Sequence, residues 1–331
     1  MLLLGMAVLL LFGIHITNGP VPLTLHQVWA AITGEATDPV LPAIVLGVRI
    51  PQALTALLAG GGLALSGLLM QTLFRNPLAG PSVLGISSGA ALAVALVMMA
   101  GTVLHIPWSS SAWAVVIAAM IGAFAVLLVI LAADRRVGDP TTLLIIGLMV
   151  GYLCSALVSV LQLSSGAAML KGFVVWGMGS FATVGPDRLP FLAVPVLLGT
   201  VAALLLMKPL NALLMGDLQA SSMGTSVRRA KRTIILVTGL LAGTITAFCG
   251  PIAFLGLATP HVARALLGTS DHARLLPATL LTGALLALLC DLVVRLPATG
   301  QHLPLNAVTS LLGAPVVLWV LLRGRKWSSA V

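Results

Sequence analysis

The chain has 331 residues, of which 59% are hydrophobic and only 8% are charged. Ordinary soluble domains carry about 25% charged residues, and a water-soluble fold could not bury this much apolar surface. The formal net charge of +9 would suggest a nucleic-acid partner in a soluble protein, but the 17 basic residues do not gather in one patch of the sequence. We therefore expect an integral membrane protein with a single transmembrane domain over residues 1–331, in contact with lipid and with no nucleic-acid partner.

The apolar stretches predict an all-α protein with about ten membrane-spanning helices, since one span needs about 20 residues. The first stretch lacks the basic start and the small-residue cleavage site of a signal peptide, so we predict a span there. Residues 41–74 are too many for one upright span and imply tilt, a break at Pro51 or an end outside the hydrocarbon. Residues 164–189 predict a short interfacial helix instead of a span. The predicted spans are residues 1–16, 41–74, 82–101, 112–132, 141–163, 190–207, 231–249, 252–267, 275–295 and 305–322.

The basic residues indicate the orientation of these spans. With a cytoplasmic N-terminus, thirteen Lys and Arg residues fall on the inner side and four on the outer side. This asymmetry is the positive-inside rule, and it predicts that both termini are cytoplasmic. The outer residues are Arg49, Lys171, Arg188 and Arg295. The inner residues are Arg75, Arg135, Arg136, Lys208, Arg228, Arg229, Lys231, Arg232, Arg264, Arg274, Arg323, Arg325 and Lys326.

The longest polar segment on the inner side covers about residues 208–230. Leu210, Leu213, Leu214 and Leu218 recur there at helical spacing. This pattern predicts short amphipathic helices, which dock either on the membrane surface or on a partner protein. The residues alone leave both possibilities open.

Two similar segments, Gly80-Pro81 and Gly250-Pro251, open the third and eighth predicted spans. Because these openings are expected at opposite faces of the membrane, they predict an inverted repeat of spans two to five against spans seven to ten. Chance recurrence of a Gly-Pro turn is the alternative interpretation. The glycine-rich run at 58–67 indicates close packing between helices.

The sequence offers no recognisable catalytic chemistry. It contains neither a G-x-x-x-x-G-K-[ST] phosphate loop nor an H-E-x-x-H zinc pair. The one G-x-S-x-G match, residues 85–89, lies within an apolar span, whereas a nucleophile elbow needs a turn from strand to helix. The histidines and cysteines lack ligand spacing. We therefore predict a transport subunit with no catalytic residue and no metal site.

Asp291 is a carboxylate inside an apolar stretch and must have a partner, because an unpaired charge there is costly. Arg295, four residues later, could form an internal ion pair with it. A proton-coupled secondary transporter would instead use Asp291 as a relay, together with His261. Both alternatives follow from the residues.

Joined motifs in both halves of the chain resemble the FecCD/BtuC family of importer permeases, and the resemblance covers nearly the whole chain. In the first half the motifs are Arg49-Ile50-Pro51-Gln52, Ala64-Leu65-Ser66-Gly67 to Gln71, Arg75-Asn76-Pro77-Leu78-Ala79-Gly80-Pro81 and Leu84-Gly85-Ile86-Ser87-Ser88-Gly89-Ala90. In the second half they are Gly250-Pro251-Ile252-Ala253-Phe254-Leu255-Gly256-Leu257, Pro260-His261-Val262-Ala263-Arg264, Asp291 with Arg295, Leu303-Pro304 and Leu312-Gly313-Ala314-Pro315.

The resemblance implies a BtuC-like type II ABC importer permease in a bacterial inner membrane. Family members pair as homodimers or pseudo-dimers, work with two cytoplasmic ATPase subunits and a periplasmic binding protein, and pass the cargo along the subunit interface. ATP and Mg²⁺ would act at the partner ATPase, and this chain would bind no cofactor. The implied cargo is a metal chelate, with haem or a ferric siderophore ranked before cobalamin.

The resemblance also implies site residues. The amphipathic segment matches the coupling helices of the family, which contact the ATPase through Gly216, Asp217, Leu218, Ala220 and Gly224. The cytoplasmic gate would involve Asn76, Leu78, Pro140 and Thr141.

The family docks its binding protein through outer arginines, which match Arg49 and Arg295 here. Gln52 departs from the family pattern, which often has a second arginine at this place. The alternative roles are snorkelling to the interface for either arginine, or the ion pair with Asp291 for Arg295.

Overall fold

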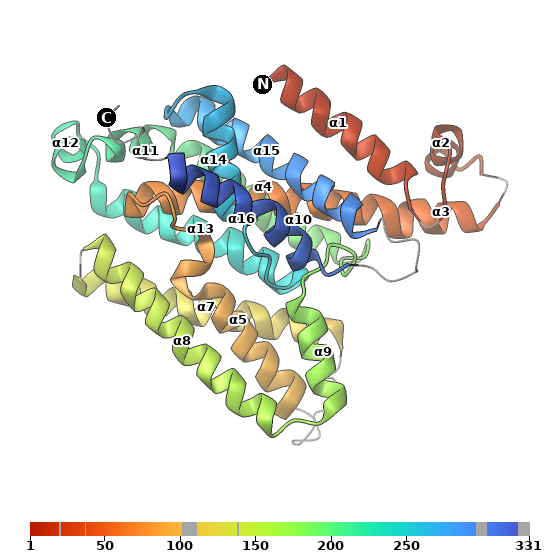
Figure 1. The fold of residues 1–331 in the computed structure, drawn as a ribbon, viewed down its shortest axis with the longest axis horizontal. Helices are drawn as coiled ribbons and strands as arrows, with labels where there is room; N and C mark the ends of the chain where they lie inside the picture. Colours follow the sequence, from red (N-terminus) through yellow and green to blue (C-terminus); the bar gives the residue numbers. More distant parts are fainter. Residues whose placement is uncertain (20, 37, 101–110, 138, 296–302, 324–331) are drawn as a thin grey trace.

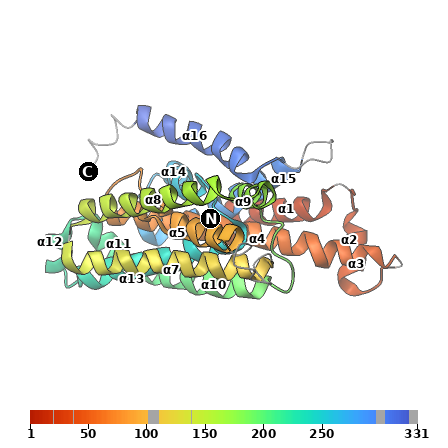
Figure 2. The same cartoon turned by 90° about the horizontal axis from the view of Figure 1, so that it is seen from below.

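The computed structural model describes residues 1–323 except 20, 37, 101–110, 138 and 296–302, and within these residues the chain is helical without strands. Figures 1 and 2 show one bundle in which most long helices run roughly along a common axis. The first half contains α1 (Leu2–Thr17), α2 (Leu25–Thr33), α3 (Val40–Ile44), α4 (Ile50–Phe74), α5 (Ile86–Ala95), α7 (Ala112–Val137) and α8 (Pro140–Leu163). The second half contains α9 (Ala167–Gly177), α10 (Leu189–Leu205), α11 (Met207–Leu214), α12 (Asp217–Ser222), α13 (Val227–Cys249), α14 (Leu255–Leu267), α15 (His272–Val294) and α16 (Leu305–Arg323).

Helix α4 is the centre of the bundle. It packs against α10, α13, α14 and α15, so that 83% of its most apolar window is buried. In contrast, only 22% of the corresponding window of α8 is buried. Helices α5, α7 and α8 pack on one another at the lower edge of Figure 1 and meet the rest mainly through α13. The central helix therefore contacts protein on nearly every side, whereas α8 leaves most of its surface to lipid or to another subunit.

Glycines in α4 allow this close packing, as the run at 58–67 predicted. A Cβ atom at Gly60 would lie 2.3 Å from the carbonyl oxygen of Gly283 in α15, and one at Gly67 would lie 1.7 Å from that of Gly256 in α14. Both distances are far below a van der Waals contact. Neighbouring backbones can approach this closely only because these glycines have no side chain.

Replacement of Gly67 by alanine should therefore destabilise the bundle, by about 1–3 kcal/mol or more, because α14 must shift away from α4. The measurement is the thermal unfolding midpoint of the purified protein in detergent or nanodiscs. Gly13→Ala in α1 is the matched control, since no atom lies within 4 Å of a Cβ built there. Equal midpoints for the two variants would show that the α4–α14 contact is not tight.

The long run at 41–74 forms an almost continuous helix from Val40 to Phe74. It is not broken at Pro51, as one of the sequence alternatives required. A π-helical turn at Val45–Arg49 precedes the proline. Pro51 cannot donate a backbone hydrogen bond and its ring crowds the preceding turn, and a wider turn relieves both problems without a break.

The ten predicted spans correspond to helices of unequal length. Five described helices can cross a membrane by length and apolar composition: the Val40–Phe74 helix, α7, α8, α13 and α15. A sixth forms if α10 and α11, bent by 52° relative to each other, count as one span. The remaining predicted spans are α1, α5, α14 and α16, which are shorter. Residues 167–177 form α9, the short helix expected within residues 164–189.

The two Gly-Pro segments explain why α5 and α14 are short, since each of these helices begins only after its Gly-Pro segment. After α4, the chain forms a 3₁₀ turn at Pro81–Leu84 before α5 begins. After α13, residues Pro251–Ala253 are not helical and α14 begins at Leu255. The two segments meet inside the bundle, because a Cβ at Gly256 would lie 2.8 Å from the Pro81 ring. An inverted repeat predicts that the two segments enter the bundle from opposite ends and meet between these ends.

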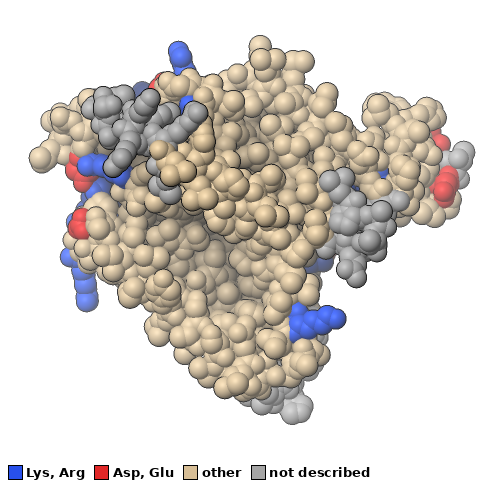
Figure 3. Space-filling model, viewed as in Figure 1, with Lys and Arg blue, Asp and Glu red and all other residues tan. Residues whose placement is uncertain are grey.

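The two ends of the bundle differ in charge. We call the end with α11 and α12 the basic end, since Figure 3 shows Lys and Arg side chains gathered there. The other end, called the α2 end, carries α2 and α3 and shows acidic side chains at its tip. Arg325 and Lys326, which the sequence predicts on the inner side, lie outside the described residues.

Candidate functional site

A groove opens at the basic end, with a volume of about 750 Å³. The end of α4, the start of α8 and the α11–α12 segment form its walls, so it joins residues that the sequence assigned to the gate and to the coupling segment. The lining residues are Leu73, Phe74, Arg75, Asp139, Pro140, Thr141, Met215, Gly216, Asp217, Leu218 and Gln219. We call this cavity the basic-end groove.

Asp217, the first residue of α12, connects three elements within this groove. Its Oδ1 accepts a hydrogen bond of 2.6 Å from Nη2 of Arg75, the residue that ends α4. Its Oδ2 accepts one from Nζ of Lys231 in α13. One carboxylate thus holds α12 against the ends of two long helices.

The segment around α12 presents apolar side chains to the surface. Leu218 is 90% exposed, and Met215 and Met223 beside it are also exposed. On the opposite side, Leu210 and Ala220 are fully buried. The predicted apolar pattern is thus packed on the bundle only along α11, through Leu210 and Leu213, whereas Leu214 and Leu218 are exposed.

Two glycines bound this short helix. Gly216 has a φ of 107° and Gly224 a φ of 81°, a backbone region that other residues seldom adopt. They allow the chain to turn sharply into and out of α12. The position of Leu218 and Asp217 thus depends on glycine at both places.

The side chain of Asn211 anchors α11 to the bundle. Its Oδ1 accepts a 2.9 Å hydrogen bond from the backbone N–H of His272, and its Nδ2 donates a 2.7 Å bond to Asp271. His272 Nε2 in turn lies 2.9 Å from the hydroxyl oxygen of Thr72 in α4. These bonds link α11 to the start of α15 and to the last turn of α4.

The predicted gate residues lie in two places. Pro140 and Thr141 line the basic-end groove. Leu78 instead lines a separate cavity of about 330 Å³ beside the two Gly-Pro segments. The Asn76 Oδ1 accepts a 2.9 Å hydrogen bond from the backbone N–H of Leu78 and fixes this turn. Within one chain, the described structure does not bring all four residues into one pocket.

Asp139 caps the N-terminus of α8 next to Pro140. Its Oδ2 accepts bonds of 2.8 Å from both the backbone N–H and the hydroxyl of Thr142. These bonds, the backbone one first, lower the pKa of the Asp139 carboxyl below its usual value. The cap therefore remains ionised at neutral pH and fixes the start of α8 at the groove.

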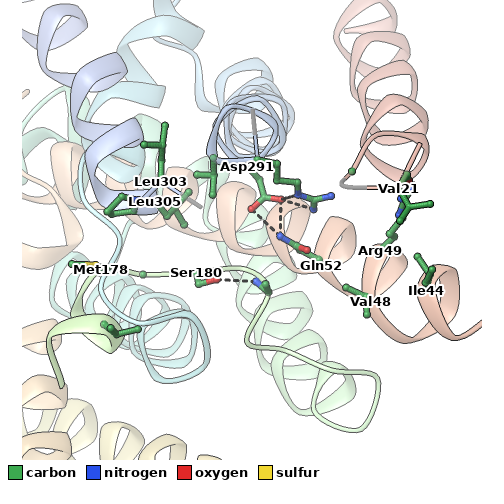
Figure 4. A pocket seen from close by; sticks show the side chains of 17 residues that line it. Val21, Ile44, Val48, Arg49, Gln52, Met178, Ser180, Asp291, Leu303 and Leu305 are labelled. Atoms are coloured by element: carbon green, nitrogen blue, oxygen red, sulfur yellow. Dashed lines mark hydrogen bonds and ion pairs between the residues drawn. The ribbon is translucent and has the colours of Figure 1, made fainter. Parts of the chain in front are cut away.

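A second cavity, of about 500 Å³, lies at the α2 end (Figure 4). Both predicted docking arginines, Arg49 and Arg295, are among its lining residues. Val21, Ile44 and Val48 contribute apolar walls on the side toward α2 and α3. We call this cavity the α2-end pocket.

Both arginines already have partners within the chain. Arg49 is only 4% exposed, and its Nη1 donates hydrogen bonds of 2.6 and 2.8 Å to the carbonyl oxygens of Ile16 and Thr17. Its Nη2 donates to the carbonyl of Val21. The guanidinium of Arg49 thus ties the end of α1 to the π-helical turn.

Asp291 has the partners that a buried carboxylate requires. It accepts bonds from Nη2 of Arg295 at 2.6 Å and from Nε2 of Gln52 at 3.0 and 3.2 Å, and His15 Nε2 lies 2.7 Å away. Figure 4 shows Gln52 and Asp291 facing each other across α4 and α15. The internal ion pair between Arg295 and Asp291 that the sequence allowed is present.

The proposed relay partner of Asp291 lies far away. His261 bonds to the carbonyl of Pro77 at 2.8 Å and lies near Gln71. Gln71 and Gln52, the neighbour of Asp291, are 19 positions apart on α4, which corresponds to about 28 Å. No direct proton transfer between Asp291 and His261 is possible over that distance.

Asn306, which the sequence analysis missed, joins three segments at the start of α16. Its side chain donates to the carbonyls of Gly177 and Pro251 at 2.9 and 2.8 Å and accepts from the backbone N–H of Ala253 at 2.9 Å. Three bonds satisfy a side chain amide almost completely. A polar residue two positions after the Leu-Pro motif, within an otherwise apolar run, was the available signal.

Residues 6–323 match the sequence profile of the FecCD transport family. The chain belongs to this family. A FecCD chain is a transport subunit and not a catalytic one, and the fold seen here, all-helical with a central α4, is the BtuC-like permease fold of ABC importers. The resemblance drawn from the joined motifs is therefore confirmed.

Several FecCD relatives align over most of the chain. The hemin transport system permease HmuU of Yersinia pestis is 36% identical over 332 residues, covering 99% of this chain and 97% of the relative. The vitamin B12 import permease BtuC of Klebsiella pneumoniae is 38% identical over 279 residues, covering 84% and 82%. A solved structure of an inward-facing metal-chelate type ABC transporter superposes with a TM-score of 0.84 at 33% identity, covering 97% of each chain.

These FecCD relatives are permeases of ABC importers, so the chain is a permease subunit of that kind in a bacterial inner membrane. A proton-coupled secondary transporter finds no support among them. Within the described residues, no three His, Cys, Asp or Glu side chains come together in a way that could hold a metal ion.

Proposed function

We propose that this permease moves a metal chelate from the periplasm to the cytoplasm, driven by ATP hydrolysis on separate subunits. The basic-end groove carries this proposal, because Asp217 joins the short helix α12 to the end of α4 while Leu218 remains exposed beside it. A helix held in this way can receive an ATPase and transmit its movement to the centre of the bundle.

The basic end is proposed to face the cytoplasm, with both termini on that side. The charge asymmetry of the loops supports this orientation. Two ATPase subunits, which bind ATP and Mg²⁺, would contact the exposed side of α12. The residues predicted for this contact are Gly216, Asp217, Leu218, Ala220 and Gly224. Of these, Leu218 would meet the ATPase directly, whereas Ala220 is fully buried and would only pack α12 on the bundle.

The cytoplasmic gate is proposed to form between two copies of the permease. Pro140 and Thr141 of α8 lie beside Arg75, and Asn76 and Leu78 follow Arg75 in the chain. The exposed apolar surface of α8 supports pairing with a second copy, because a subunit or lipid must cover it. A movement of α12 would shift the α4 end and α8 together and so change the opening between the copies.

The α2-end pocket is proposed to lie below a docked periplasmic binding protein. Arg49 and Arg295 line this pocket, and a carboxylate of the binding protein would meet positive charge there. Both guanidinium groups keep their internal bonds in this proposal. They contribute positive electrostatic potential at the opening of the α2-end pocket and hold the walls of this pocket in position.

Haem or a ferric siderophore is the proposed cargo, and cobalamin is the alternative. Iron chelates are the commoner cargo of the resembled family. The relatives whose names specify hemin and vitamin B12 support a large metal chelate in general. The separate binding protein would make the first selection among such chelates.

ATP-driven uptake into proteoliposomes tests the proposal. The permease is purified with the ATPase and the binding protein encoded beside it, and haem, ferric siderophores and cobalamin are offered in parallel. We expect one chelate to accumulate only when ATP and the binding protein are both present. Accumulation that needs neither and instead follows an imposed proton gradient would contradict the importer assignment.

A further inference from the structure

An exposed apolar surface on α2 has no function in the sites described above. Leu25 and Trp29 are 73% and 65% exposed, and Ile32 and Val21 are exposed beside them. Leu25, Trp29 and Ile32 follow at intervals of four and three residues, so they share one side of the helix. The other side packs on the bundle through Val28 and Ala31. We call Val21, Leu25, Trp29 and Ile32 the α2 patch.

The α2 patch lies beyond the reach of the bilayer. The Val40–Phe74 helix has 35 residues and is about 52 Å long, whereas a bilayer with its headgroups is about 40–45 Å thick. With Arg75 at the inner surface and an average tilt of about 20°, the helix still rises by about 49 Å, so the Val40 end stands outside the opposite surface. Figures 1 and 2 show α2 next to this end, farther out than the ends of α13 and α15. Exposed apolar side chains at such a place mark an interaction site.

Charge distinguishes a protein partner from a lipid surface. Helices that lie on membranes usually carry Lys or Arg on their polar side. Residues 19–48 contain no Lys or Arg, and their charged residues are Glu35 and Asp38. This segment has no attraction for anionic headgroups. A tryptophan is common both at membrane surfaces and at the centre of protein interfaces, so the absence of basic residues is the observation that favours a protein partner.

The α2 patch is continuous with the lining of the α2-end pocket. Val21 belongs both to the patch and to the lining of the α2-end pocket, where Ile44 and Val48 extend the apolar wall. The basic groups of this pocket are bonded internally, Arg49 to backbone carbonyls and Arg295 to Asp291. Gln52, at a place where the family often has an arginine, bonds to Asp291. The surface that remains free for a partner is therefore mainly apolar.

We infer that the α2 patch, centred on Trp29, is a docking surface for the binding protein and meets an apolar, charge-poor region on its rim. This inference rests on the proposed function, since it requires a partner that delivers cargo to the α2-end pocket. The contribution of the α2 patch to binding should depend little on salt, because the patch buries apolar surface and no charge.

Binding of the purified binding protein to the permease–ATPase complex in nanodiscs tests the inference. We expect Trp29→Ala and Leu25→Ala each to weaken binding by about 10- to 100-fold, as truncation of an interface centre does, and this loss relative to the wild type should be the same at about 0.1 and 0.5 M NaCl. Leu198→Ala, which truncates a leucine of similar exposure on α10 outside every site described above, is the matched control and should bind as the wild type does.

A photoreactive phenylalanine analogue at position 29 then identifies the occupant. Crosslinking to the binding protein supports the inference, whereas crosslinking to lipid or to a second permease copy overturns it. Unchanged affinity of both alanine variants, with a wild type that binds and transports, overturns the α2 patch alone. A wild type that neither binds the partner nor takes up any chelate overturns the proposed function as well.

Discussion

The Asp217→Ala variant should still fold but move about tenfold less cargo per ATP hydrolysed. The Arg75–Asp217 pair is about half exposed, and such pairs contribute only about 0–1 kcal/mol to stability. Lys231 is buried and loses its carboxylate partner, so a moderate loss of stability accompanies the change. Loss of both pairs would also free α12 from the ends of α4 and α13. Coupling between distant sites changes by about 0.5–2 kcal/mol for substitutions of this kind, which corresponds to a few-fold to about 30-fold.

The measurement is the ratio of chelate taken up to phosphate released in proteoliposomes. Asp217→Glu should restore most of the ratio, because it keeps the carboxylate. Asp134→Ala is the matched control, since it removes another ion pair of α13, the 3.3 Å pair with Arg232, outside the groove lining. An Asp217→Ala ratio equal to that of the wild type would show that the movement of α12 reaches α4 by another route.

The Asp291→Ala variant should lose about 3–5 kcal/mol of stability, the usual cost when one partner of a buried ion pair is removed. Asp291 and Arg295 are both nearly inaccessible to solvent, and His15 lies 2.9 Å from the Arg295 guanidinium. Without the carboxylate, the Arg295 charge has no counter-ion. Chemical unfolding in detergent micelles measures this loss.

A double replacement separates charge from packing at this site. Asp291→Asn combined with Arg295→Gln removes both charges but keeps hydrogen-bonding groups for His15 and Gln52, and should be closer to the wild type in stability than Asp291→Ala. If the network is purely structural, ATP-driven uptake of this double variant should also approach that of the wild type. Strong loss of uptake in a stable double variant would indicate that Arg295 contributes directly to docking at the α2-end pocket.

Most of the long helices could be predicted from the sequence, because lipid demands apolar runs and these are visible locally. Helices α7, α8, α13 and α15 agree with the predicted spans within a few residues. The short α2 was not predicted, since it has only nine residues and a hydropathy window of span length does not detect so short a helix. Its capping box, in which Thr24 and Gln27 bond reciprocally, was the available signal.

The site residues could be predicted only where they belong to a sequence motif. The motifs singled out the α12 segment and the two arginines, whose roles stay predictions, and the spacing along α15 offered the Arg295–Asp291 pair that the structure contains. Asp217 meets Arg75 across 142 positions, and Asp291 meets His15 across 276. Contacts between residues so far apart depend on how the helices pack, and spacing along one chain contains no information about them.

The central place of α4 also bears on how the protein is made. A helix with three consecutive glycines, Gly60 to Gly62, and polar residues such as Gln52 and Gln71 enters lipid less readily than the more apolar α7. In the finished bundle those groups contact α13, α14 and α15, all of which are synthesised long after α4. During synthesis α4 must therefore remain in the membrane or in the translocation channel without these contacts. It reaches its final position only after the second half of the chain has been synthesised.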